Sequence, residues 1–156
     1  MRVRRGSPAD ARELAELARR AITITAAPIY DQLQIEQWAG HFTEAVLART
    51  IDTGTVFVVG SGPSACGFAS LVGTSGGRDE VGDLYVDPEF VGRGVARRAL
   101  DAVESEARRR SIGRLWVDAS LLAAPVLEHV GYVVEERYDK RVGTVVYPNT
   151  WLTKSL

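Results

Sequence analysis

The sequence lacks the features on which disulfide-bonded and membrane proteins depend. It has one cysteine, Cys66, in 156 residues, so no intrachain disulfide can form. It has no run of about 18 apolar residues, so we expect neither a transmembrane helix nor a membrane partner. The N-terminal segment "MRVRRGSPADARELAEL" has no apolar signal-peptide region. We therefore expect a cytoplasmic protein in which the thiol is buried and structural.

The sequence also lacks an excess of charge of either sign. Its 19 Lys and Arg residues nearly balance its 20 Asp and Glu residues, which leaves a formal net charge of −1. A nucleic-acid-binding domain usually carries a basic excess, so we expect no nucleic-acid partner. Apolar residues make up 46% and charged residues 25% of the chain. These values and the length predict one globular domain over residues 1–156.

The hydrophobic pattern predicts helices and strands in a mixed order. A short first strand and amphipathic helices come first. Three strands separated by turn-rich segments then predict an antiparallel meander over residues 55–59, 66–72 and 80–86. The longest predicted helix covers residues 94–111, and the strand "RLWVDA" follows it, which makes one βαβ crossover. "LYV" and "LWV" should therefore lie on parallel neighbouring strands, before the short helix "APVLEHV" and two final strands.

A glycine-spaced loop, "VGRGVA", joins the meander to the long helix. Gly92 and Gly94 would let an anion approach the main chain closely, because the first N–H groups of a helix have no partner within it. The dinucleotide fingerprint G-x-G-x-x-G/A does not fit, because Arg97 occupies its third position. The P-loop motif G-x-x-x-x-G-K-[ST] is absent. Two interpretations remain: a site for another phosphate group, and a plain glycine turn that opens a helix.

"VGRGVA" resembles the [QR]-x-x-G-x-[GA] motif of the GNAT superfamily of N-acetyltransferases. Its flanks agree, since "LYV" and "DP" precede the loop and an amphipathic helix follows it. The segment "DASLLAAPVLEHVGYVVEE" is similar to the family's fifth strand, short helix and G-[FY] turn. Tyr30, Gln34 and Trp38 resemble residues that recur in one branch of small bacterial acetyltransferases, most of whose acceptors are unassigned. The resemblance spans essentially the whole chain.

The resemblance implies an α+β fold with α/β/α layers. We expect a mixed, mostly antiparallel central sheet of about seven strands, flanked by about four to five helices, with one βαβ crossover. The fourth and fifth strands of this sheet are expected to splay apart. The resemblance implies that the pantetheine arm of a coenzyme lies in the resulting cleft like an additional strand.

The resemblance also implies acetyl-CoA as the cosubstrate, and no metal. The loop would hold the coenzyme A pyrophosphate through main-chain N–H groups, with Arg93 and Arg97 adding positive charge. Main-chain groups of Leu84 and Val86 would pair with the pantetheine arm, and the Val86 N–H would polarise the thioester carbonyl. Ser120 is either a polar contact to the coenzyme or a helix cap. The expected coenzyme-binding residues are Leu84, Tyr85, Val86, Val91, Gly92, Arg93, Gly94, Val95, Ala96, Arg97 and Ser120.

Two positions depart from the family's pattern. Val91 replaces the usual Gln or Arg at the start of the loop motif, a change that keeps the backbone N–H. Leu127 stands where the family commonly has the tyrosine that protonates the leaving thiolate. Candidate replacements for that acid are Tyr132, Tyr138, Tyr147 and His129. A thiolate is a good leaving group, so a mechanism without a dedicated acid also stays open.

Direct acetyl transfer to an amine needs a base, because most amines are protonated at neutral pH. Glu80 and Asp83, on the predicted fourth strand, are the candidate bases, and Asp118 at the end of the fifth strand is a weaker third. Each of these carboxylates has an alternative interpretation as a solvated charge at a strand edge. Alternation along the strand places Asp83 and Tyr85 on one face.

The acceptor implied by the resemblance is a primary amine on a small molecule or a peptide. We expect its pocket between the second helix and the last hairpin, although core packing would explain any one of the aromatic residues there. The candidate walls are Tyr30, Trp38, His41, Phe42 and Trp151. A homodimer, common in the superfamily, is left open by the sequence.

Three functions compete on these grounds. The first is an acetyl-CoA-dependent N-acetyltransferase. The second is a non-catalytic acyl-CoA-binding or regulatory module, which the departure at Leu127 favours. The third is a dinucleotide-binding domain, which Arg97 disfavours.

Thermal unfolding with different coenzymes separates these functions. Acetyl-CoA at 100 times its Kd should stabilise the fold by about 2.7 kcal/mol and raise the Tm, whereas NAD should not. Release of free thiol from acetyl-CoA across a panel of amines distinguishes an enzyme from a binding module. A Tm that rises with NAD and not with acetyl-CoA would revive the dinucleotide interpretation.

Overall fold

The computed structural model describes all 156 residues and contains one seven-stranded sheet with the strand order β1-β2-β3-β4-β5-β7-β6. Only the β4–β5 pair is parallel, because the crossover through α4 returns the chain in the same direction. The predicted meander and crossover are both confirmed. The strands are β1 (Arg2–Arg5), β2 (Thr55–Ser61), β3 (Ser64–Gly73), β4 (Asp79–Val86), β5 (Arg114–Ala119), β6 (Val133–Val142) and β7 (Val145–Ser155).

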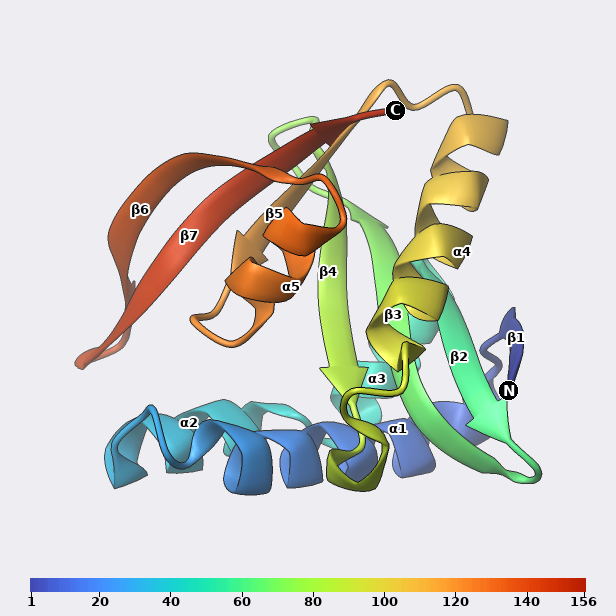
Figure 1. Cartoon of the computed structure of the whole chain (residues 1–156). Helices are drawn as coiled ribbons and strands as arrows, with labels where there is room; N and C mark the ends of the chain where they lie inside the picture. Colours follow the sequence, from blue (N-terminus) through green and yellow to red (C-terminus); the bar gives the residue numbers. More distant parts are fainter.

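Helices lie on both faces of this sheet, which gives the expected mixed α+β architecture (Figure 1). On one face lie α1 (Ala11–Arg20), α2 (Gln32–His41) and α3 (Glu44–Thr53). On the other face lie α4 (Val95–Arg109) and α5 (Ala123–His129). Two buried clusters correspond to these layers. One joins β3 and β5 to α4 and α5, and the other joins β2 and β3 to α1 and α3.

A bulge in β4 determines which way the side chains of this strand point. Ala69 of β3 pairs with Leu84 and Leu71 pairs with Val81, so β4 has one residue more than β3 between these pairs. As a result Val81 and Leu84 both pack against the cluster beneath α4. Tyr85 packs against the opposite cluster, beneath α1 and α3. The bulge therefore places the side chains of Val81 and Leu84, which are three residues apart, on the same face of the sheet, and that of Tyr85 on the other face.

The parallel strands β4 and β5 pair at one point only, Glu80 with Trp116. Beyond that point they diverge, while β5 continues its pairing with β7 as far as Ala119. The expected splay between the fourth and fifth strands is thus present. It opens at the carboxyl ends of both strands, a usual position for ligand sites in sheets with crossovers.

Two local features differ from simple regular structure. A π-helix, Ala21–Ala26, follows α1, where the sequence predicts only the end of an ordinary helix. Pro148 lies in β7, which is an interior strand, although proline is expected at an edge. Thr150 is the first residue of β7 that pairs with β5, so the strand has a free edge on that side at Pro148.

The helices include none whose length and apolar character would allow it to cross a membrane.

The close approach of α4 to the sheet requires glycine at position 67. A Cβ atom at Gly67 would lie 2.5 Å from Val95 Cγ1 and 2.8 Å from the Tyr85 carbonyl oxygen. We expect Gly67→Ala to lower the free energy of unfolding by about 1–3 kcal/mol, because α4 or β4 must shift to accommodate the methyl group. Urea denaturation measures this effect.

Gly73→Ala is the matched control, since it lies at the end of the same strand and has open space around its Cα. It should change the free energy of unfolding by less than about 0.5 kcal/mol. Equal effects of the two substitutions would contradict this account of the contact between α4 and the sheet.

Candidate active site

Two cavities meet where β4 and β5 diverge. We name them the aromatic cavity, of about 590 Å³, and the glycine-loop cavity, of about 600 Å³. The residues that line both are Trp38, Leu84, Tyr85, Ser120 and Ala123. Two molecules bound one in each cavity could therefore meet beside these residues.

The glycine-loop cavity ends at the N-terminus of α4. Gly92 and Gly94 have φ values of +80° and +78°, in the left-handed region that favours glycine. Neither Cα has another atom within 4 Å of the place where a Cβ would lie, so the main chain is open to an approaching group. The first N–H groups of α4 follow directly, and Arg97 lines the same cavity. This arrangement suits a phosphate group.

The structure brings together all but one of the residues predicted to bind the coenzyme. Arg93 is the exception, because its guanidinium lies over the Phe90 ring, 5.2 Å from the centroid, and does not line the cavity. The others line the glycine-loop cavity: Leu84, Tyr85, Val86, Val91, Gly92, Gly94, Val95, Ala96, Arg97 and Ser120.

Asp87 holds the turn between β4 and the glycine loop. Its buried carboxylate accepts hydrogen bonds from Arg20, at 2.5 Å, and from the Glu89 N–H, at 3.0 Å. Its own N–H donates to the Cys66 carbonyl. Arg20 ends α1, directly before the π-helix that forms the facing wall of the cavity. The two walls are thereby tied together by an ion pair.

The aromatic cavity is walled by residues of α2 and of the segment before it. Tyr30, Trp38, His41 and Phe42, all predicted as walls, line it. Trp151 does not line this cavity. Its ring packs against the rings of Trp116 and Tyr138 on the neighbouring strands β5 and β6. The other polar residues of the lining include Gln37, Lys140 and Asn149, which the sequence did not single out.

The three recurrent residues Tyr30, Gln34 and Trp38 each bind a different part of the chain. The Tyr30 hydroxyl accepts the Leu121 N–H at 2.8 Å, after β5. The Gln34 Nε2 donates to the Val146 carbonyl of β7 at 2.7 Å. The Trp38 Nε1 donates to the Tyr85 hydroxyl of β4 at 2.9 Å. Together these bonds hold α2 across the cavity.

Asp83 is the carboxylate of the aromatic cavity that is least engaged with the protein. Its Oδ2 accepts one hydrogen bond, from the Ser70 hydroxyl at 2.8 Å, and it has no ion-pair partner. Burial raises the pKa of Asp83, while the Ser70 hydrogen bond and the nearby His41 act in the opposite direction. A carboxylate with a raised pKa and free lone pairs is suited to accept a proton. The sequence analysis did not single out Ser70. This fully buried polar residue lies within the apolar run "CGFASLV", and such a position indicates a buried polar partner.

Asp118 also lines the aromatic cavity, but its oxygens are already occupied. It accepts hydrogen bonds from Tyr138, Lys140 and Asn149, at 2.8, 3.0 and 2.9 Å. The ammonium of Lys140 neutralises its charge. These bonds fix the β5–β7–β6 part of the sheet and engage both oxygens of Asp118 with protein groups.

Glu80 lies at the opposite end of β4 from the meeting point of the cavities. It pairs with Trp116 and lines neither cavity. Burial is the main cause that raises its pKa, and the negative charge of Asp118 adds to it. Of the two carboxylates predicted as bases, only Asp83 lies in the cavity.

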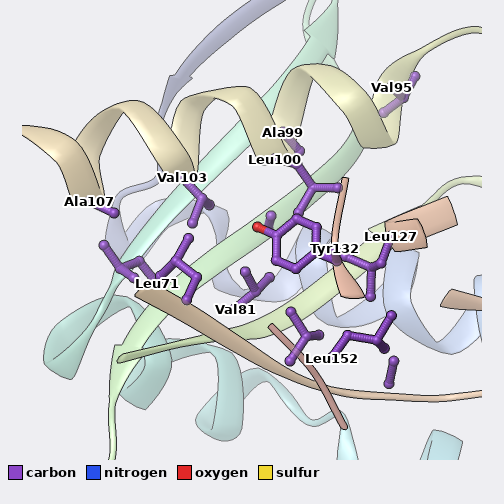
Figure 2. Packing of buried hydrophobic residues seen from close by; sticks show 14 of the residues in the cluster. Leu71, Val81, Val95, Ala99, Leu100, Val103, Ala107, Leu127, Tyr132 and Leu152 are labelled. Atoms are coloured by element: carbon purple, nitrogen blue, oxygen red, sulfur yellow. The ribbon is translucent and has the colours of Figure 1, made fainter. Parts of the chain in front are cut away.

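Tyr132, predicted as a catalytic residue, lies in the core and not at the cleft. Figure 2 shows its ring among aliphatic side chains of α4, β4 and β7, and it lines neither cavity. Its buried hydroxyl has no hydrogen-bond partner, and burial followed by the charge of Glu104 raises its pKa. Leu127 is fully buried in the same cluster. The structure therefore does not bring Tyr132 together with Asp83.

Other hydroxyls lie closer to the meeting point of the cavities. The Tyr85 hydroxyl accepts a hydrogen bond from Trp38, which leaves its own proton free to be donated. The Ser120 hydroxyl accepts the Ala123 N–H at 3.2 Å and has the same freedom. Tyr147 lines the aromatic cavity and donates to Gln37, whereas Tyr138 donates to Asp118.

His129, the remaining candidate acid, lines the glycine-loop cavity.

No group of three or more His, Cys, Asp or Glu side chains is arranged to hold a metal ion.

Sequence comparison relates the chain to known acetyltransferases. A family model described as an acetyltransferase (GNAT) domain matches residues 26–151. An uncharacterized N-acetyltransferase of Escherichia coli (strain K12), YafP, is 31% identical over 90% of this chain and 88% of its own length.

Solved structures agree with this relation. A GCN5-related N-acetyltransferase from Rhodopseudomonas palustris has a TM-score of 0.90 and 33% identity, over 99% of this chain and 95% of that one. The PaiA N-acetyltransferase from Thermoplasma acidophilum, solved with coenzyme A, has a TM-score of 0.82 over 99% of this chain and 98% of that one. Its identity is 19%, so it supports the fold alone.

Asp83→Asn should stabilise the protein at pH 7 by on the order of 1 kcal/mol, because it removes a carboxylate whose charged form burial disfavours. The Ser70 hydroxyl can still donate to the amide oxygen. Because the pKa of Asp83 is higher in the folded than in the unfolded chain, wild-type stability falls as pH rises through that pKa. The gain should therefore vanish in acid, below the usual carboxyl pKa of about 4.

Urea unfolding of both proteins across a pH series measures this effect. A gain of equal size at every pH, or a loss at pH 7, would contradict the assigned electrostatic environment of Asp83.

Proposed function

The chain belongs to the GNAT family of N-acetyltransferases, and from this premise we propose that it moves the acetyl group of acetyl-CoA directly to a primary amine. The acceptor amine would bind in the aromatic cavity and the coenzyme in the glycine-loop cavity. The observation that carries this proposal is that the two cavities meet beside Tyr85 and Ser120, with Asp83 on the acceptor side.

Coenzyme A would lie with its pyrophosphate against the glycine loop. The supporting observations are the open main chain at Gly92 and Gly94, the first N–H groups of α4 and the cation of Arg97. The PaiA N-acetyltransferase, which has the same fold, was solved with coenzyme A bound. Val91 is exposed and contributes its backbone N–H irrespective of its side chain.

The N–H groups of β4 supply the polar contacts to the thioester. The Asp87 N–H bonds the Cys66 carbonyl of β3, so alternation along the strand directs the Val86 and Leu84 N–H groups toward β5. β5 has diverged from β4 at this level. These N–H groups therefore face the cleft, where Val86 can donate to the thioester oxygen as negative charge develops on it.

Asp83 would act as the base, directly or through one water. It takes a proton from the ammonium group of the acceptor, and the free nitrogen lone pair then attacks the thioester carbonyl carbon. The C–N bond forms and the C–S bond breaks, so the coenzyme leaves as a thiolate. The nitrogen then loses its second proton, which passes to the thiolate directly or through solvent. The hydroxyls of Tyr85 and Ser120, which line both cavities, would donate a hydrogen bond to that sulfur and so compensate for the absence of the family's tyrosine at Leu127.

The aromatic walls favour an acceptor with an apolar body, on a small molecule or a peptide. We further propose that residues 1–156 act as one acetyltransferase domain in the cytoplasm, where a lone reduced cysteine is usual. Dimerisation and a bacterial source remain expectations of the sequence resemblance.

Asp83→Asn should lower kcat/KM for acetyl transfer by about 10²- to 10⁴-fold, the range for loss of a general base. Since the pKa of Asp83 is raised, wild-type kcat/KM should rise with pH above the usual carboxyl range, and the variant should lose this limb. Thiol release from acetyl-CoA across a panel of amines measures both effects.

Glu80→Gln is the matched control, because it removes a carboxylate of the same strand that lines neither cavity. It should leave kcat/KM for a monoamine acceptor within about three-fold of the wild-type value. A larger loss with Glu80→Gln than with Asp83→Asn would overturn the assignment of the base. Binding of acetyl-CoA without turnover of any amine would favour the non-catalytic module.

A further inference from the structure

We propose that the acceptor carries a second cationic group, and that the open sheet face beside the aromatic cavity binds it. The subsite is formed by Trp116, Trp151 and Tyr138, which we call the tryptophan platform. In the structure Arg78 of this chain covers it. The proposal deepens the proposed acetyl transfer, and rests on it for the identity of the ligand as the acceptor.

The three rings of the platform lie on one face of β5, β7 and β6. The core of the other face takes Leu115 and Val117 of β5, so Trp116 points away from it. The Trp116 and Trp151 rings make an edge-to-face pair, with centroids 6.4 Å apart and planes at 79°. Tyr138 lies nearly parallel to Trp151, also at 6.4 Å. All three rings are half-buried, and the exposed side chain of Arg78 lies over the two tryptophans.

The guanidinium of Arg78 shows which chemistry this surface accepts. Its Cζ lies 3.9 Å from the Trp116 centroid and 5.3 Å from that of Trp151. Stacking of a planar cation on indole is the most favourable cation–π arrangement in proteins. The Arg78 side chain makes no hydrogen bond and no ion pair with any protein group, so it is held by stacking and by a longer-range attraction to Glu80.

Displacing that side chain would leave its loop intact. The turn before β4 is closed by main-chain and hydroxyl contacts of Thr74, which accepts the Gly77 N–H and bonds the main chain of Arg78. None of these bonds involves the guanidinium. A competing cation therefore has to replace only an exposed stacking contact.

The charge of Glu80, which no ion pair neutralises, favours a cation from the acceptor. Glu80 is the register partner of Trp116 and accepts no hydrogen bond from a side chain. The negative charge of Asp118 raises the pKa of Glu80, and the positive charge of Arg78 lowers it. Asp118 lines the aromatic cavity and follows Trp116 by two residues on the same strand face, a separation of about 7 Å. A short flexible spacer would thus join an amine in the aromatic cavity to a cation on the platform.

Binding of methylguanidinium to the protein without acetyl-CoA tests the platform independently of catalysis. The indole N–H signals of the three tryptophans, assigned by single Trp→Phe variants, report the site by NMR. We expect the Trp116 and Trp151 signals to shift and the Trp38 signal to stay unchanged. Arg78→Ala should tighten binding about two- to five-fold, because it removes the competing guanidinium.

Arg114→Ala is the matched control, since its guanidinium lies 5.9 Å from the same Trp116 ring, too far for close stacking. It should not change the affinity for methylguanidinium. An affinity that Arg78→Ala leaves unchanged or weakens, or a shift of Trp38 alone, would overturn the proposal. Circular dichroism and the Tm confirm that both exposed substitutions leave the fold intact.

Acetyl transfer to agmatine, compared with n-butylamine, tests the link to the acceptor. Agmatine should have the lower KM, and Arg78→Ala should lower it further while leaving the KM for n-butylamine unchanged. Equal KM values with intact methylguanidinium binding would overturn the link to the acceptor. Absence of transfer to any amine, with platform binding intact, would instead refute the proposed function and leave the platform as a cation site.

Discussion

The active site depends on the point at which β4 and β5 stop pairing. The two strands share a single register pair, Glu80 with Trp116, and then diverge. The bulge in β4 turns Val81 and Leu84 toward one helical layer and Tyr85 toward the other. Main-chain N–H groups that a continuous sheet would satisfy are thereby left facing a cleft. Main-chain groups of the sheet lack partners at this place, and an extended ligand can form hydrogen bonds with them by binding there as a further strand.

Carboxylates of similar chemistry differ here because of their partners. Asp118 is matched by an ammonium, a phenol and an amide, so its charge is neutralised locally. Asp83 has a single hydroxyl donor, and burial makes its charged form unfavourable. A similar contrast separates Asp87, which is paired with Arg20 beside the glycine loop, from Glu80, which lies outside both cavities. Of the carboxylates that line the aromatic cavity, Asp118 is thus fully engaged with the protein, whereas Asp83 has a single hydroxyl donor.

Local patterns in the sequence predicted most of the fold and many of the residues that line the glycine-loop cavity. The glycine loop, the crossover and the meander are encoded by neighbouring residues, and the structure contains all three. The catalytic side was less predictable, because it depends on contacts between distant segments. Tyr132 and Glu80 have suitable chemistry, but packing against α4 and the register of β5 keep them out of the cleft. Ser70 acquires its role only because β3 lies beside the β4 bulge.

The bonds that hold α2 across the aromatic cavity have a consequence for how the site forms. Gln34 and Val146 are 112 residues apart, and Tyr147 and Gln37 are 110 apart. The glycine loop, in contrast, is assembled from consecutive elements in the middle of the chain. Contacts of such long sequence separation form late, because closing a long chain segment costs entropy before any contact rewards it. During synthesis the glycine loop can therefore form while the C-terminal hairpin is still unmade, and the aromatic cavity is completed last.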